Sequence, residues 1–177
     1  MSAEKESLPL EPQNFSISIH AWMQQAQATH GIGHDDHAEY HGYCSRKLQR
    51  IRHHGHVKKD LIHNSKYAAS VSTRGRPRHA YAPRDDTDAL EIVPHEEFLW
   101  VWLVQSERAW AHGMQLKHSG NRQHSLRRLG KAVTYAKKLE ALAVKNCDAS
   151  TVTECQAYAA WMQASWALEK GRYKVSV

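Results

Sequence analysis

The stretch QHSLRRLGKAVTYAKKLEALAVK, residues 123–145, decides the fold class of this chain. Its apolar side chains recur every three or four residues, at Leu126, Leu129, Val133, Ala136, Leu139 and Ala143. This spacing places them along one face of a helix, with the lysines and arginines on the rest of its surface. No strand pattern stands out elsewhere in the chain, so the sequence predicts an all-helical fold.

Four further helices are expected, over residues 16–29, 35–54, 96–118 and 151–170. Gly31 and Gly33 separate the first two helices, and the Asp35 carboxylate is placed to cap the second. The second helix carries an apolar stripe formed by Tyr40, Cys44, Leu48 and Ile51. We therefore expect antiparallel helical hairpins.

Gly171, followed two residues later by Tyr173, fits the turn of a tetratricopeptide-type helix pair. The chain would then be cut within a repeat of a longer protein. Residues 1–13 are expected to form a flexible tail, and residues 14–177 a single helical domain. Within that domain, the apolar residues of segment 55–93 follow neither a helical nor a strand periodicity, and the segment contains glycine and prolines. This pattern predicts a long irregular basic linker between the second and third helices.

The positive charge of the chain is concentrated in one segment. The whole chain of 177 residues carries a formal charge of +6. Residues 44–84 hold eleven lysines or arginines and the single acid Asp60, or +10, so the remainder carries −4. A block of like charge repels itself unless a partner neutralises it, which points to a polyanion. A solvated basic face without a partner is the alternative.

The termini and cysteines indicate an intracellular protein without membrane insertion. The N-terminus has no charged-then-apolar signal pattern, and the longest apolar run, residues 98–104, is far shorter than a membrane span. Cys44, Cys147 and Cys155 are an odd number without close pairing, as expected of free thiols in a reducing compartment.

Metal binding and catalysis have weak support. His30, His34, His37 and His41 would line up on a continuous helix, but the glycines interrupt it, and no HExxH or close cysteine pair is present. Cys44 lies near His41 and Arg46, yet it falls on the apolar stripe, where cysteine usually packs as a small hydrophobe. We expect no metal, no cofactor and no catalytic residue.

Nucleic acid fits the charge pattern better. The second helix bears a broad polar face whose candidate RNA-binding residues are Tyr43, Arg46, Lys47, Arg50, Arg52 and His53. Guanidinium groups bind phosphates bidentately and stack on bases. The major groove of A-form RNA is too deep and narrow for a helix, so an arginine-bearing helix needs a groove opened by a bulge, loop or junction. Structured RNA is favoured over plain duplex.

Two more basic groups widen the expected footprint. The first continues into the linker, at Lys58, Lys59, Lys66, Arg74, Arg76 and Arg78. The second lies on the later helices, in a stretch without acids between Glu107 and Glu140, at Arg122, Arg127, Arg128, Lys131, Lys137 and Lys138. A different function remains open at this point. A helical repeat whose groove takes a partner peptide would leave the basic strip merely solvated.

Four stretches resemble the 68-kilodalton subunit family of the signal recognition particle. They are HGIGHDDHAEYHGYCSRKLQRIRH at residues 30–53, SERAWAHGMQLK at 106–117, LRRLGKAVTYAKKLEAL at 126–142 and ECQAYAAWM at 154–162. The resemblance implies a tetratricopeptide-like domain that binds the particle's RNA near the three-way junction of its S domain. It implies an arginine-rich helix in a widened major groove, here Arg46, Lys47, Arg50 and Arg52, and remodelling of an RNA loop.

The resemblance also implies partners and a location. The rest of the subunit would bind the 72-kilodalton subunit, with other particle proteins on the same RNA. The particle would be cytoplasmic, with nucleolar assembly, and peripheral to the endoplasmic reticulum during protein targeting. This sequence departs from the family pattern at Gly33, His41 and Gln49, where the family commonly has arginine.

Overall fold

The computed structural model describes residues 14–53, 93 and 95–171, and across these residues the fold is all-helical, as predicted. The elements are α1 (Ile19–Thr29), the short 3₁₀ helix η1 (Ile32–His34), α2 (His37–His53), α4 (Glu97–His118), α5 (Arg122–Asn146) and α6 (Ala149–Glu169). The linker over residues 55–93, apart from Val93, and the tail over 1–13 lie outside the described residues. In the part of the chain that is described, no helix is long and apolar enough to cross a membrane.

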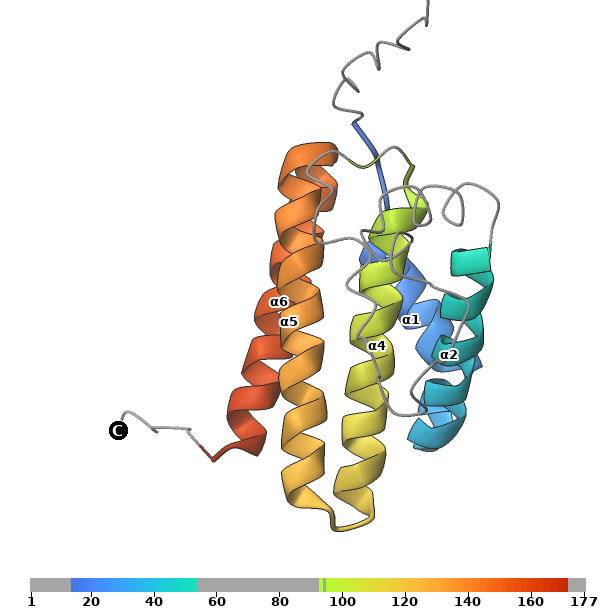
Figure 1. Cartoon of the computed structure of the whole chain (residues 1–177), viewed down its shortest axis with the longest axis vertical. Coiled ribbons are helices and arrows are strands. Elements are labelled where there is room, and N and C mark those ends of the chain that lie inside the picture. Colours follow the sequence, from blue (N-terminus) through green and yellow to red (C-terminus); the bar gives the residue numbers. More distant parts are fainter. Residues whose placement is uncertain (1–13, 54–92, 94, 172–177) are drawn as a thin grey trace, which may run out of the picture.

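The helices are arranged as antiparallel neighbours in a row (Figure 1). The row runs α2, α4, α5, α6, and each helix packs on the next. Helix α1 lies behind the row, on the face away from the viewer, and touches α6. The connections from α4 to α5 and from α5 to α6 are short. Consecutive helices that pack together across a short connection run antiparallel. The predicted helical hairpins are therefore confirmed.

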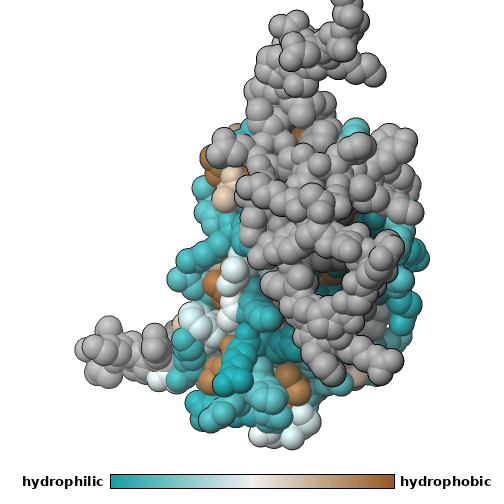
Figure 2. All heavy atoms as spheres, in the orientation of Figure 1, coloured by the Kyte–Doolittle hydropathy of each residue, from teal (hydrophilic) through white to brown (hydrophobic). Residues whose placement is uncertain are grey.

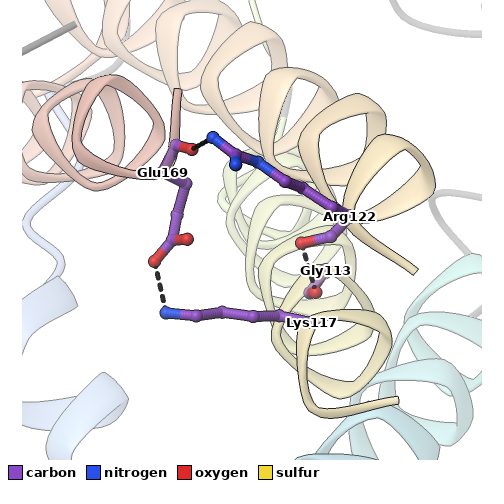
Figure 3. Close-up of polar contacts among 5 residues, drawn as sticks. Gly113, Lys117, Arg122 and Glu169 are labelled. Carbon is purple, nitrogen blue, oxygen red and sulfur yellow. Dashed lines mark hydrogen bonds and ion pairs between the residues drawn. The ribbon is translucent and has the colours of Figure 1, made fainter. Parts of the chain in front are cut away.

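Helix α4 is the centre of the bundle, and most of its side chains are buried. At its C-terminal end it approaches α5 closely at Gly113, where a Cβ atom would lie 2.9 Å from the Leu129 side chain. The Ser125 hydroxyl donates a hydrogen bond to the Gly113 carbonyl oxygen at 2.8 Å, in the region drawn in Figure 3. The absence of a side chain at Gly113 thus sets the distance between these two helices.

The apolar stripes predicted from the sequence form the core. On α5, Leu126 is half-buried and the other five stripe residues are buried. On α2, Tyr40, Cys44 and Leu48 are almost completely buried. Burial of a leucine-sized side chain contributes about 1.5–3 kcal/mol, so these contacts dominate the packing of the helices.

The first helix starts three residues later than predicted, at Ile19. The preceding residues are extended and lie beside the α5–α6 connection. The Phe15 amide donates to the Asn146 carbonyl oxygen at 2.9 Å, and the Asp148 amide donates to the Phe15 carbonyl oxygen at 3.0 Å. The Ile17 amide donates to the Thr151 hydroxyl at 2.9 Å. These long-range bonds satisfy the backbone that a helical turn would otherwise satisfy.

The cap of the second helix is Asp36 rather than Asp35. The Asp36 carboxylate accepts a hydrogen bond from the Glu39 amide at 2.8 Å, which is the geometry of an N-cap, and α2 begins at His37. Asp35 instead takes a left-handed backbone conformation, with φ of 59°, that closes the turn after η1. Two adjacent aspartates offer the same cap chemistry, and the turn geometry selects the second.

A buried carboxylate joins four helices at the middle of the bundle. Glu107 of α4 has no exposed surface. One carboxylate oxygen accepts hydrogen bonds from the Tyr40 hydroxyl of α2 at 2.7 Å and the Gln27 side-chain amide of α1 at 2.9 Å. The other accepts from the Tyr158 hydroxyl of α6 at 2.7 Å. Burial raises the pKa of Glu107, and the three donors act against that shift.

Replacing this carboxylate should strongly destabilise the fold. Glu107→Ala removes the acceptor of two buried tyrosine hydroxyls and of the half-buried Gln27 amide. We expect the free energy of unfolding to fall by about 3 kcal/mol or more. Urea unfolding followed by circular dichroism measures the change. Glu96→Ala is the control, because Glu96 is exposed and should change stability by less than about 0.5 kcal/mol. Equal unfolding midpoints for the two variants would contradict the role of the network.

Candidate nucleic-acid interface

Helix α2 turns two of its arginines directly away from the core. Arg46 follows the buried Cys44 by two residues, and Arg50 follows the buried Leu48 by two. Two residues correspond to a rotation of about 200°, so each arginine points to the opposite side of the helix from a core residue. Arg46, Arg50 and His53 are all exposed. In the described part of the chain, neither Arg46 nor Arg50 is paired with a carboxylate.

Tyr43 and Lys47 lie on the flank of α2 that faces α1. The Tyr43 ring stacks on the His30 ring with 3.7 Å between ring centroids, and Tyr40 lies beside it at 6.1 Å. Partial burial raises the pKa of the Tyr43 hydroxyl. One face of the Tyr43 ring is therefore covered by a side chain of the same protein, and Lys47 is half-buried one turn further along.

The other flank of α2 faces the middle of the row. Arg52 follows His41 by eleven residues, which is three helical turns along the same line. The His41 ring lies 4.8 Å, centroid to centroid, from the ring of His112 on α4. Arg108 of α4 and Arg128 of α5 lie close enough to lower the pKa of His41, after the larger effect of burial. This flank thus reaches across α4 to the basic residues of α5.

The basic residues of α5 do not form one group. Arg127, Arg128 and Lys131 are exposed. Arg122, at the start of the helix, is turned toward α6, where its Nη2 donates to the Glu169 carbonyl oxygen at 3.4 Å (Figure 3). The Glu169 carboxylate also pairs with Lys117 at 2.5 Å. Arg122 therefore belongs to the contacts that hold the ends of α4, α5 and α6, separately from Arg128.

Sequence reasoning missed Arg108, His112 and His41 as members of a basic surface. On the side of the molecule shown in Figure 2, the described surface that is visible is mainly hydrophilic. Arg108 and His112 are half-buried polar residues, four positions apart, in a helix otherwise buried over most of its length. That spacing was a usable signal, because it places both residues on one side of α4, a side that the described neighbouring helices leave open. The linker candidates Lys58, Lys59, Lys66, Arg74, Arg76 and Arg78 lie outside the described residues.

The cysteines have the environment of packing residues. Cys44 and Cys155 are buried, and burial raises the pKa of each thiol to about 12. Cys147 is half-buried, with a pKa raised to about 11 by burial and by Asp148. A thiol with such a pKa stays protonated near neutral pH, and the thiolate is the reactive form. The prediction that Cys44 packs as a small hydrophobe is confirmed.

The four histidines that share a helical spacing do not share a helix. Helix α1 ends at Thr29 and α2 starts at His37, with Gly31 at φ of 104° between them. A different group, Asp35, His37 and His118, has ligand atoms within 4.8 Å of one another. The His37 ring in this group is buried and lies 5.6 Å from Trp110, centroid to centroid. Its Nδ1 lies 3.5 Å from the Asp35 carboxylate, so His37 has its polar and aromatic partners within the fold.

A chelator should change neither the helicity nor the melting temperature. The bundle is held by the buried stripes and by the Glu107 network, and none of these contacts requires a metal. Circular dichroism with and without EDTA measures the effect, with His118→Ala as the matched variant because His118 is exposed. A large loss of helicity on chelation in the parent chain, absent in His118→Ala, would establish a structural metal.

These features define the class: an all-helical domain in which α2 carries two exposed arginines, Arg46 and Arg50, without a carboxylate partner among the described residues. A family model described as RNA-binding signal recognition particle 68 matches residues 32–177. The chain belongs to this family, and the resemblance noted in the sequence is confirmed.

Relatives from distant organisms agree. Signal recognition particle subunit SRP68 of Drosophila melanogaster is 35% identical over 170 residues, covering 92% of this chain and 26% of the relative. The subunit of the same name from Caenorhabditis elegans is 30% identical over 184 residues, covering 98% and 27%. That of Dictyostelium discoideum is 27% identical over 180 residues, also covering 98% and 27%. The chain thus spans about a quarter of the length of these relatives.

Proposed function

We propose that this chain is an RNA-binding domain that helps to assemble the signal recognition particle. It binds and remodels the particle RNA near the three-way junction of the S domain, with α2 as the arginine-bearing helix. The observation that carries the proposal is the outward position of Arg46 and Arg50 on α2, in a chain whose family is described as RNA-binding. Exposed guanidinium groups without carboxylate partners are available to phosphates.

The position of α2 in the fold supports insertion into a groove. It is the outermost helix of the row α2, α4, α5, α6, so one full side of it is free of protein neighbours among the described elements (Figure 1). A helix of this width needs an RNA major groove that a junction or bulge has opened. We infer remodelling from that requirement, because a groove that is too narrow in the free RNA must widen as the helix enters.

The domain would act as a structural component rather than an enzyme. Its partners would be the particle RNA, other particle proteins on that RNA, and the 72-kilodalton subunit, the last through regions beyond this chain. It would work in the cytoplasm after nucleolar assembly and lie peripheral to the endoplasmic reticulum during co-translational targeting.

A second candidate function is a protein-interaction module. It is favoured by Trp161 and Leu168 on α6, whose side chains are 40% and 54% exposed. Exposed aromatic and aliphatic side chains of this size suit a partner helix or peptide. The two functions differ in their response to salt, since phosphate contacts weaken steeply as salt rises and apolar contacts do so far less.

Fluorescence anisotropy with two labelled RNAs tests the proposed function. One RNA contains the S-domain junction of the particle RNA, and the other is a perfect duplex of equal length. We expect tighter binding to the junction at every salt concentration, with a steep salt dependence for both RNAs. Equal, weak binding to both RNAs would mean that α2 binds polyanions without regard to their structure, and it would favour the interaction module.

Removing one outward arginine should weaken RNA binding more than removing an equal charge elsewhere. Arg50→Ala should lower the affinity for the junction RNA and reduce the slope of log affinity against log salt by about one unit. Lys137→Ala is the matched control, because Lys137 is equally exposed but lies on the side of α5 opposite Arg128. Both variants should have the same melting temperature as the parent chain. Equal affinity losses for the two would remove α2 from the interface.

A further inference from the structure

Four side chains from three helices form a cationic cluster on the open side of α4. His41 comes from α2, Arg108 and His112 from α4, and Arg128 from α5. The two imidazole rings lie 4.8 Å apart, centroid to centroid, with their planes inclined by 36°. Both arginines lie close enough to each imidazole to affect its titration. Arg128 is exposed and the other three are half-buried, so solvent reaches the cluster.

The cluster contains two fixed positive charges and no described counterion. Neither Arg108 nor Arg128 is paired with a carboxylate in the part of the chain that the structure describes. Glu107 precedes Arg108 in the sequence, but its carboxylate is buried and bonded to Tyr40 and Tyr158. A group of positive charges with nothing opposite it is a site for an anion.

The histidines are held neutral by the same surroundings. Partial burial lowers the pKa of His41 and of His112, and the neighbouring cations lower both further. The charged and titratable groups that act on His41 are Arg108 and His112 from α4 and Arg128 from α5. All of them disfavour a second charge on the imidazole. An anion placed among them would reverse that balance and favour the imidazolium form.

We propose that His41, Arg108, His112 and Arg128 form a binding site for a phosphodiester group of RNA, and that phosphate binding is coupled to protonation of the histidine pair. This inference rests on the proposed function and adds a second contact surface to the outward face of α2. A phosphodiester stays anionic over the whole physiological pH range, so the proton must be taken up by the protein. The arginines supply permanent charge, and the histidines supply charge only when the ligand is present.

The direction of the pH dependence follows from linkage. Bound phosphate raises the histidine pKa above its value in the free protein. Affinity therefore rises as pH falls from the bound-state pKa toward the free-state pKa, and it is constant above both. Each proton taken up changes affinity by at most tenfold per pH unit. The Arg46 and Arg50 contacts do not titrate in this range and should contribute a pH-independent part.

The test measures affinity for the junction RNA between pH 6 and 8 at constant ionic strength. For the parent chain we expect binding about five- to tenfold tighter at pH 6 than at pH 8. The double variant His41→Gln with His112→Gln should lose most of this pH dependence and bind less than about threefold tighter at pH 6 than at pH 8. His20→Gln is the matched control, because His20 is exposed on α1 and outside the cluster, and it should keep the parent pH dependence. Thermal melting of each variant confirms that it is folded.

A second measurement separates failure of the site from failure of the proposed function. Dimethyl phosphate, a small phosphodiester, is titrated into the chain while the His41 and His112 ring signals are followed by NMR across the pH range. A rise in their pKa with dimethyl phosphate supports the site even if the junction RNA does not bind, an outcome that would overturn the proposed function. Junction binding with the same pH dependence in the double histidine variant would overturn the site and leave the proposed function standing. No response to either ligand would overturn both.

Discussion

The buried carboxylate of Glu107 is the interaction on which the arrangement of the helices depends. It is a hydrogen-bond acceptor placed at the centre of an apolar bundle, and it can be tolerated there only if donors surround it. Those donors come from α1, α2 and α6, and neither α1 nor α6 is next to α4 in the order of the described helices. A single ionisable group thus fixes the positions of three helices against the fourth.

This constraint also sets what the surface presents. Because the Tyr40 hydroxyl must reach Glu107, the rotation of α2 about its axis is fixed, and Arg46 and Arg50 are carried to the outside. Because Glu107 must point inward, Arg108, one residue further along α4, is turned toward the open side of the row. The positions of the charged side chains on the surface therefore depend on a polar contact in the core.

Much of the fold could be predicted from periodicity, because the stripes on α2 and α5 follow the helical repeat closely. The errors lie where a helical pattern meets competing contacts. The start of α1 depends on hydrogen bonds from Phe15 and Ile17 to the end of α5 and the first turn of α6, about 130 residues away. The choice between Asp35 and Asp36 depends on a turn conformation. Glu107 gave no sequence signal for burial, since an acid beside an arginine is the ordinary pattern of a solvent face. The cluster of His41, Arg108, His112 and Arg128 could not be predicted, because its members are up to 87 positions apart and meet only through packing.

The close approach of α4 and α5 at Gly113 links packing to charge. Gly113 follows His112, and its contact Leu129 follows Arg128, so this close approach lies beside the cationic cluster. The separation of these like charges is set by the missing methyl group of a glycine. A Cβ atom added at position 113 would push α4 and α5 apart and would increase the distance between the charges on the two helices. The electrostatic potential of this face therefore depends on the packing of an uncharged residue inside the bundle.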